Sequence, residues 1–214
     1  MTKTTVAVIG LGYVGLPLAL LASKRGFRVV GIDLNKKRVA QINARKSPFR
    51  DKEIVKVLSG AKNLRASTDF ADIEQASVVT ICVPTPVHGN SLPDLRSVIS
   101  ACLNISQHLQ RGQLIILEST VNPGVCEEVV IPTIEKTSGL RAGKDFYVAH
   151  CPERINPGDR NWNVQNIPRV VGSLDAASLR KALSFYRRLV AAKITPMGSL
   201  KEAEAVKIVE NSFL

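Results

Sequence analysis

The feature that most constrains this chain is a set of three glycines, Gly10, Gly12 and Gly15, directly after an apolar segment at residues 5–9. The spacing is G-x-G-x-x-G, and the residues that follow have helical spacing. In such a turn the first glycine permits the bend, the second lets the backbone approach a pyrophosphate, and the third lets helix and strand pack closely. The N–H groups at the start of the helix then face the phosphates. The motif predicts a dinucleotide site.

An acidic residue at the end of the next predicted strand completes the pattern. Asp33 closes the apolar segment at residues 28–32 and lies 18 positions after Gly15. A carboxylate there accepts hydrogen bonds from the adenosine ribose and disfavours the extra phosphate of NADP. This context disfavours the alternative that the glycines only form turns. We expect NAD as the cofactor, although the basic residues at 36–38 weaken the argument against NADP.

Strand-like and helical segments alternate along the chain. The predicted strands are apolar, and several lack polar alternation, which indicates burial on both faces; they are residues 5–9, 28–32, 77–83, 114–117, 146–149 and 169–171. The predicted helices are residues 13–24, 36–44, 54–58, 95–109, 125–137 and 176–189. The alternation predicts an α/β fold with a Rossmann-like, doubly wound, mainly parallel sheet.

The end of the chain departs from this alternation. Pro196 and Gly198 interrupt the pattern, and Ser199 and Glu202 then have the spacing of a capping box. The helix that this predicts has an apolar face formed by Ala203, Val206, Val209 and Phe213. We expect residues 1–196 to form an NAD-binding Rossmann domain. Residues 197–214 would be the truncated start of a helix that leads to a second domain, because too little chain remains to cover this face.

The chain is basic, with a net charge of +11. A basic surface attracts polyanions, but the cations occur in scattered pairs such as Arg187 and Arg188, and few aromatic residues could stack on bases. We interpret most of them as solvated helix faces and expect no nucleic-acid partner. Because no apolar run is long enough to cross a bilayer and no signal peptide is recognisable, we expect a cytoplasmic protein with no membrane partner.

The four cysteines, Cys82, Cys102, Cys126 and Cys151, show no CxxC pairing and no histidine at metal-ligand spacing. A cytosolic context would keep them reduced. We interpret them as small buried hydrophobic side chains and predict no metal site.

Three more motifs follow predicted strands, where a doubly wound sheet binds its ligand. They are Val83-Pro-Thr-Pro86, Glu118-Ser-Thr-Val121 and Pro152-Glu-Arg-Ile-Asn-Pro-Gly158. Each alone is typical of a proline-rich loop. Together with Gly10-Leu-Gly-Tyr-Val-Gly-Leu-Pro17, they make the chain resemble the amino-terminal part of the UDP-glucose/GDP-mannose dehydrogenase family, and most closely its UDP-N-acetylhexosamine 6-dehydrogenase branch.

This resemblance implies an activity. The family oxidises C6 of a nucleotide sugar from alcohol to carboxylate by two hydride transfers to NAD, through a thiohemiacetal and a thioester on a cysteine. The glycine-rich segment around that cysteine is absent here, so we expect the nucleophile to lie beyond this chain and the fragment alone to be inactive. The resemblance also implies a UDP-sugar substrate, a homodimer in the full-length protein and a role in polysaccharide biosynthesis.

The resemblance also implies roles for individual residues. The cofactor-binding candidates are Gly10, Gly12, Tyr13, Val14, Gly15, Asp33, Arg38, Thr85 and Thr120. The substrate-binding candidates are Arg154, Ile155, Lys207 and Asn211, and the catalytic candidates are Lys207, Asn211, Thr120 and Glu153. The spacing of Lys207 and Asn211 places both on one helix face, where an ammonium and an amide N–H can stabilise an oxyanion. For Lys207, the alternative is a solvated helix lysine.

Two other functions fit parts of the sequence. A 3-hydroxyacid or 6-phosphogluconate type dehydrogenase also combines a phosphate loop with a Lys-x-x-x-Asn helix. Those families usually approach that lysine through glycines, whereas this chain has Lys201-Glu-Ala-Glu-Ala-Val206. A non-catalytic NAD-binding module or basic adaptor fits the net charge and the missing nucleophile.

Overall fold

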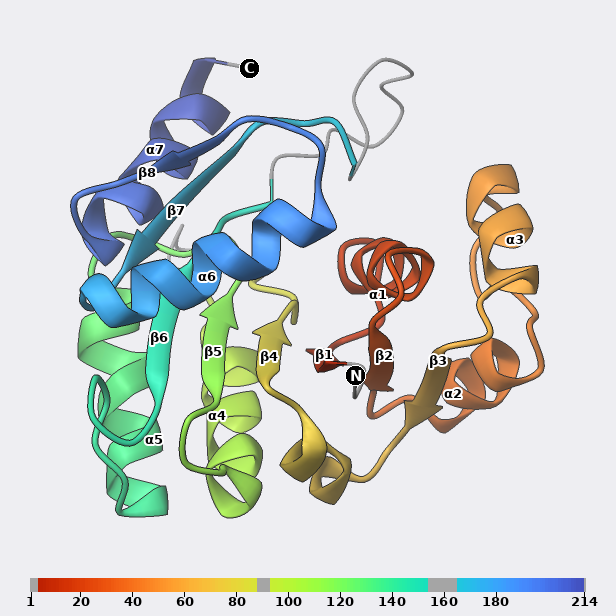
Figure 1. Ribbon diagram of the computed structural model, residues 1–214, viewed down its shortest axis with the longest axis horizontal. Helices are drawn as coiled ribbons and strands as arrows, with labels where there is room; N and C mark the ends of the chain where they lie inside the picture. Colours follow the sequence, from red (N-terminus) through yellow and green to blue (C-terminus); the bar gives the residue numbers. More distant parts are fainter. Residues whose placement is uncertain (1–3, 88–92, 154–164, 214) are drawn as a thin grey trace.

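The computed structural model describes residues 4–87, 93–153 and 165–213, with the backbone alone for residues 211–213. An eight-stranded sheet lies between two helical layers, in the order β3-β2-β1-β4-β5-β6-β7-β8 (Figure 1). Every neighbouring pair is parallel except β6 and β7. The prediction of a Rossmann-like, doubly wound, mainly parallel sheet is confirmed.

The strands are β1 Thr5–Ile9, β2 Arg28–Ile32, β3 Leu64–Ser67, β4 Val78–Ile81, β5 Leu114–Leu117, β6 Tyr147–His150, β7 Arg169–Ser173 and β8 Ile194–Pro196. The helices are α1 Gly15–Lys24, α2 Lys36–Asn43, α3 Lys52–Ser59, α4 Arg96–His108, α5 Ile131–Ser138, α6 Ala176–Leu189 and α7 Leu200–Phe213. A 3₁₀ segment, η1, covers Phe70–Gln75, and a π-helical segment, η2, covers Cys126–Val130.

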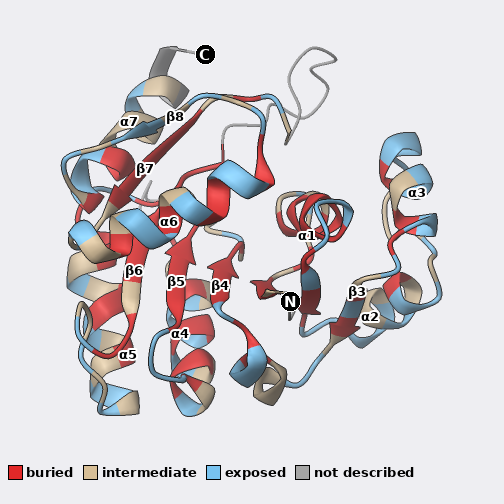
Figure 2. Ribbon diagram, viewed as in Figure 1, coloured by how far each residue is buried: buried red, intermediate tan, exposed pale blue. Residues whose placement is uncertain are grey.

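Each face of the sheet has its own hydrophobic core (Figure 2). One core joins the sheet to α1, α3 and α6, and the other joins it to η1, α4, η2, α5 and the first residue of α7. Strands β1, β4 and β5 are buried along their whole length. Burial on both faces explains why their sequences are continuous apolar runs.

Two short strands were not predicted. The four residues of β3 include Arg65 and Ser67, and the three residues of β8 end in Pro196. Such short, partly polar segments carry little intrinsic preference for a strand and are held by pairing with β2 and β7. The helix predicted over residues 125–137 begins instead as η2. Pro132 has no N–H to donate to the carbonyl four residues earlier, so a regular α-helical ladder cannot pass through it.

The predicted start of α7 is confirmed in part. The Ser199 hydroxyl accepts a hydrogen bond from the Glu202 N–H (3.1 Å), but the Glu202 carboxylate accepts from the Gly198 N–H (2.7 Å) instead of closing the capping box on Ser199. The start of α7 packs tightly on β7, because a Cβ on Gly172 would lie 2.3 Å from the Ser199 carbonyl oxygen. Of the predicted apolar face, Ala203 is buried and Val209 is 55% exposed.

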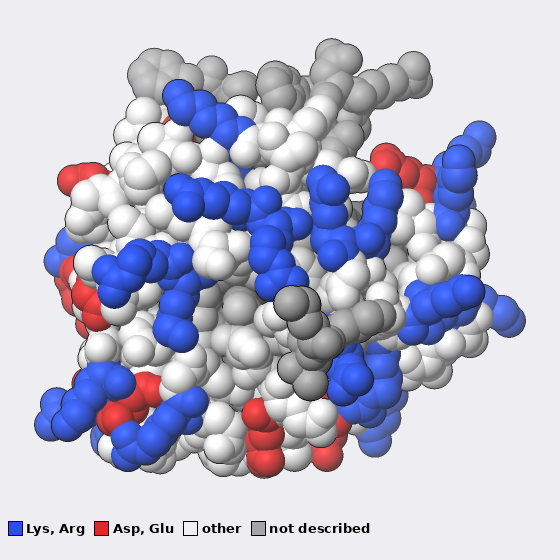
Figure 3. Space-filling view, in the orientation of Figure 1, with Lys and Arg blue, Asp and Glu red and all other residues white. Residues whose placement is uncertain are grey.

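Basic side chains are spread over the face that carries α6, with fewer acidic ones between them (Figure 3). Some pack on rings of this domain: Arg188 lies over Phe27 and Lys181 over Tyr147, each with its cationic group 4.4 Å from the ring centroid. The absence of a nucleic-acid partner stays a prediction. Within the three described ranges, no helix is both long and apolar enough to cross a membrane.

Candidate functional site

The glycine turn joins β1 to α1 at the edge of the sheet where the parallel strands end. Gly10 has a φ of +89°, and a Cβ there would lie 2.8 Å from the Cys82 carbonyl oxygen. A Cβ on Gly15 would lie 1.8 Å from the Gly10 carbonyl oxygen. Gly12 differs from both, because a Cβ there would meet no atom within 4 Å. Gly10 and Gly15 are therefore required by the fold itself, whereas Gly12 lines open space.

At the start of α1, the Leu16 N–H donates to the Gly12 carbonyl oxygen (3.1 Å). No described side chain caps this helix, whereas Asn35, Asp51 and Asp175 cap α2, α3 and α6 by accepting backbone N–H bonds. An uncapped helix N-terminus beside a glycine turn is suited to an anion such as a pyrophosphate. The open space at Gly12 and the N–H groups at the start of α1 fit the phosphates of a dinucleotide.

Asp33 follows β2 and is 8% exposed. Its Oδ2 accepts hydrogen bonds from the Leu11 N–H (2.8 Å) and from the Arg38 guanidinium (2.7 Å). Its Oδ1 accepts from the Asn35 N–H (2.9 Å). The carboxylate thus ties the glycine turn to the start of α2, and it retains capacity to accept one more bond, because an ionised carboxylate offers about four acceptor sites.

An exposed ring, a half-buried ring and a guanidinium flank the glycine turn. Tyr13 is 70% exposed and stacks on Phe49 with a centroid distance of 4.2 Å. The Arg38 guanidinium lies 5.9 Å from the Phe49 ring centroid. Val14 is half-buried against the core. Planar groups beside Asp33 are suited to contact the flat base of a nucleoside.

The predicted loops after β4 and β5 are joined to each other. The Thr85 hydroxyl donates to the Thr120 carbonyl oxygen (2.7 Å), and the Ser119 hydroxyl donates to the Val83 carbonyl oxygen (2.7 Å). Both threonines are half-buried. The two loops therefore form one wall at the carboxyl ends of adjacent strands, where open α/β sheets bind ligands.

A fully buried group of charges lies behind this wall. The Glu118 carboxylate accepts hydrogen bonds from the Tyr186 hydroxyl (2.7 Å) and from the Arg169 guanidinium (3.3 Å). The same guanidinium lies 3.7 Å from the Glu153 carboxylate. Arg169 and Glu118 are each fully buried, and Glu153 is 7% exposed. Arg169 therefore holds two acidic residues from two different ligand-facing loops.

Burial sets the protonation of this group. It raises the pKa of Glu118 to about 7, against the lowering effect of Arg169. It also raises the pKa of Tyr186 well above its ordinary value, which keeps the phenol protonated as the donor to Glu118. A carboxyl group poised near neutral pH beside a buried guanidinium is the kind of perturbed group found at functional sites.

The C-terminal helix supplies Lys207, which is half-buried, one turn after Glu204. Asn211 lies on the same helix, so the four-residue spacing predicted for the pair is met by the backbone, but its side chain is not described. Arg154 and Ile155 lie outside the described residues.

Arg169, Tyr186 and Glu204 were missed as members of the site. Arg169 could have been recognised from the sequence, because it is a charged residue at the start of an otherwise apolar strand. Tyr186 carried no such signal, because an aromatic residue on the inner face of a helix is most often part of the core. Glu204 carried little signal, because acidic residues on helices are mostly exposed.

Comparisons with known proteins identify similar sequences and structures. Residues 4–190 match the NAD binding domain of the UDP-glucose/GDP-mannose dehydrogenase family. The UDP-N-acetyl-D-glucosamine 6-dehydrogenase of Pseudomonas aeruginosa is 37% identical over 212 residues, which are 99% of this chain and 50% of that protein. The chain spans about half the length of the curated relatives it matches.

Solved structures of two dehydrogenases have a closely similar fold. The structure of a UDP-D-ManNAc dehydrogenase from Pyrococcus horikoshii has a TM-score of 0.92 at 34% identity, covering 98% of this chain and 50% of that one. The structure of a ternary complex of GDP-mannose dehydrogenase from Pseudomonas aeruginosa has a TM-score of 0.91 at 30% identity, covering 97% of this chain and 49% of that one.

Proposed function

This chain belongs to the UDP-glucose/GDP-mannose dehydrogenase family through its NAD-binding domain, and we propose that it is the NAD-binding part of a UDP-N-acetylhexosamine 6-dehydrogenase. The observation that carries the proposal is the glycine turn with open space at Gly12 beside an uncapped α1 and a buried Asp33. Its relatives include proteins named as UDP-N-acetyl-D-glucosamine and UDP-N-acetyl-D-mannosamine dehydrogenases. The nucleophilic cysteine would come from the half that this chain does not span.

NAD would be held at the glycine turn. Gly12 and the N–H groups of α1 face its phosphates, and Asp33 accepts from a ribose hydroxyl. Tyr13, Val14 and Arg38 border the adenosine, whereas Thr85 and Thr120 border the other end of the cofactor, at the wall between β4 and β5. When bound, NAD supplies the hydride acceptor for each of the two oxidation steps.

The sugar would lie against the wall and α7. Lys207 and Asn211, with Thr120 and Glu153, are the proposed catalytic groups. The Lys207 ammonium and the Asn211 amide stabilise negative charge on the C6 oxygen as it develops. Arg169 supports the site from behind, because its buried guanidinium fixes Glu153 relative to Glu118. Arg154 and Ile155 are proposed to border the sugar nucleotide.

Cofactor choice can be tested on this chain by calorimetry. We expect NAD to bind at least about tenfold more tightly than NADP, and Asp33→Asn to weaken NAD binding by about tenfold or more, because a hydrogen bond to a charged group contributes about 1.5–3 kcal/mol. Asp175→Asn, which neutralises the N-cap carboxylate of α6 and keeps a capping side chain, is the matched control. Equal affinity for both dinucleotides, or no effect of Asp33→Asn, would contradict the cofactor assignment.

Substrate class requires the full-length protein. We expect UDP-N-acetylhexosamines to be oxidised with two NADH formed per sugar, since an alcohol reaches a carboxylate by two hydride transfers. This chain alone should show no turnover. Activity with 3-hydroxyacids but not with UDP-sugars would support the other dehydrogenase class instead. A homodimer, a cytoplasmic location and a role in polysaccharide biosynthesis are part of the same proposal.

A further inference from the structure

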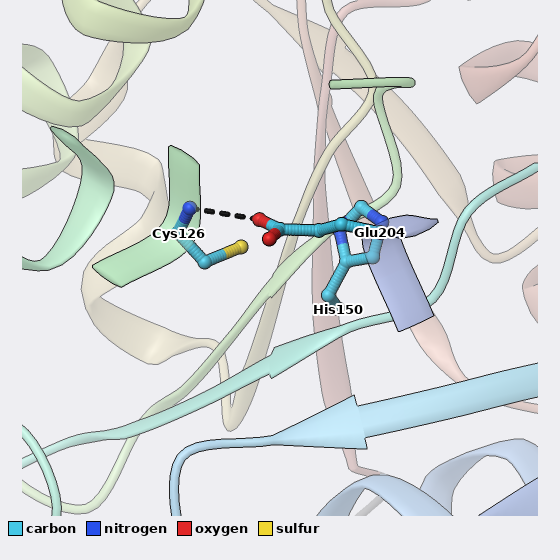
Figure 4. A group of neighbouring side chains, drawn as sticks. All are labelled: Cys126, His150 and Glu204. Carbon is cyan, nitrogen blue, oxygen red and sulfur yellow. Dashed lines mark hydrogen bonds between the residues drawn. The ribbon is translucent and has the colours of Figure 1, made fainter. Parts of the chain in front are cut away.

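Three side chains with metal-binding atoms meet in the core on the side of the sheet opposite α6. They are Cys126 at the start of η2, His150 at the end of β6 and Glu204 in α7 (Figure 4). One ligand atom of each lies within 4.8 Å of those of the other two. All three residues are 0% exposed. This group could not be predicted from the sequence, because its members lie on three separate elements.

His150 is the member that the fold does not explain. Within the described part of the chain, neither ring nitrogen has a well-formed hydrogen bond. Complete burial favours the neutral ring over the charged imidazolium. A buried polar group without a partner is costly unless something satisfies it. A neutral imidazole with a free nitrogen is the form that coordinates metals.

The other two members are already held in place. Glu204 accepts hydrogen bonds through Oε2 from the Gly124 N–H (2.6 Å) and through Oε1 from the Cys126 N–H (2.8 Å). Burial raises the pKa of the Cys126 thiol, and the nearby Glu204 raises it further. Backbone donors thus orient the carboxylate toward the thiol, as hydrogen bonds from outside a metal site orient its ligands.

We propose that Cys126, His150 and Glu204 form a zinc site. A thiolate, an imidazole nitrogen and a carboxylate oxygen are ordinary zinc ligands, and a water would complete a tetrahedron. Ligand atoms around tetrahedral zinc lie about 3.3–3.8 Å apart, given bonds of about 2.0–2.3 Å. The separations of up to 4.8 Å therefore need to shorten by at most about 1.5 Å.

The charge balance favours this metal. Binding forms a bond from zinc to sulfur and releases the thiol proton to solvent, with no change in oxidation state. The two positive charges of zinc are then balanced by one thiolate and one carboxylate beside a neutral imidazole. A neutral cluster is compatible with complete burial, whereas an isolated thiolate in this position is not.

The position of the site gives it a role. His150 lies three residues before Glu153, Glu204 lies one turn before Lys207, and Cys126 follows the loop that carries Thr120. Zinc would join these segments and fix α7 to the sheet. It would act as a structural ion that positions the residues facing the ligand.

Zinc and cobalt titrations of this chain test the proposal. We expect one tightly bound zinc per chain, a Tm that rises with zinc concentration, and a thiolate-to-metal charge-transfer absorption band when cobalt is bound instead. Cys126→Ser and His150→Asn should each weaken zinc binding by about 100-fold or more, since losing even an outer partner of a metal ligand costs about 10–100-fold. Cys126→Ser should also remove the absorption band.

Cys82→Ser is the matched control, because Cys82 is a buried cysteine in the core on the other face of the sheet. It should retain both zinc binding and the absorption band. The proposal is overturned if the wild-type chain binds no zinc or gives no thiolate band with cobalt, and these two measurements do not depend on whether any variant folds. It is also overturned if both ligand variants bind zinc as tightly as the wild type, which would place the metal elsewhere on the chain.

Discussion

The glycine turn and the buried charges of Glu118, Glu153 and Arg169, next to the ends of β5 and β6, use polar groups in opposite ways. At the glycine turn, Gly12 borders open space and no side chain caps α1. Asp33 accepts hydrogen bonds from Leu11, Asn35 and Arg38. Behind β5 and β6, Glu118 and Arg169 are fully buried and come from distant strands. The first region leaves polar groups available to a ligand, whereas the second pairs its buried charges with one another.

This difference predicts different responses to substitution. Changing a group that faces open space should affect binding more than folding. Removing one partner of a buried ion pair leaves the other charge without compensation and costs about 3–5 kcal/mol. The following variants test this contrast, from the largest expected effect to the smallest.

Arg169→Met should have the largest effect. It leaves the Glu118 and Glu153 carboxyl groups without their shared guanidinium, so the free energy of unfolding should fall by about 3–5 kcal/mol. Urea denaturation followed by circular dichroism measures this change. Arg180→Met, on the exposed side of α6, is the control and should stay within about 0.5 kcal/mol of the wild type. Equal midpoints for the two variants would show that the buried charges add nothing to stability.

Gly15→Ala and Gly12→Ala form a pair that separates folding from binding. The added methyl group at position 15 clashes with the Gly10 backbone, so we expect a loss of about 1–3 kcal/mol in unfolding free energy. At position 12 it enters open space, so stability should change by less than about 1 kcal/mol. The Gly12 variant should nevertheless bind NAD about tenfold or more weakly, because the backbone can no longer approach the pyrophosphate.

Urea denaturation of the two variants measures their stability, and calorimetry measures their affinity for NAD. If Gly12→Ala bound NAD as well as the wild type does, the phosphates could not lie at that glycine. If Gly15→Ala were as stable as Gly12→Ala, the close packing of the turn against α1 would not be needed.

Glu118 should give a smaller effect that depends on pH. Burial raises its pKa from an ordinary 4.5 to about 7, so between these values the folded chain keeps a proton that the unfolded chain has lost. This contribution to stability is complete below pH 4.5 and is lost as the pH rises through 7. The stability of the wild type relative to Glu118→Gln should therefore fall by roughly 2 kcal/mol from pH 5 to pH 8.

Urea denaturation of both proteins at each pH isolates this contribution, because groups such as His150 titrate in both and cancel in the difference. A difference that stays constant, or that grows with pH, would mean that Glu118 is already ionised in the folded chain at pH 5.

The two regions also differed in how well the sequence predicted them. The glycine turn, Asp33 and the first two strands follow from residues close together in sequence, and the strand bounds of β1 and β2 are as predicted. The motif after β5 was recognised, but not that Glu118 would meet Tyr186 from α6. The short strands β3 and β8 were missed, because pairing with a neighbour decides their conformation more than composition does.

By itself, the sequence determined the alternation of strands and helices, the dinucleotide turn and the start of α7, because these depend on local spacing and on the conformations that glycine and capping residues allow. Only the tertiary structure decided that Arg169 joins Glu118 to Glu153, and that Cys126, His150 and Glu204 meet. A charged or metal-binding side chain is stable in a core only where its partner arrives from another element. The element that supplies this partner depends on the strand order, on the antiparallel direction of β7 and on the packing of α7. None of these can be read from a short stretch of sequence.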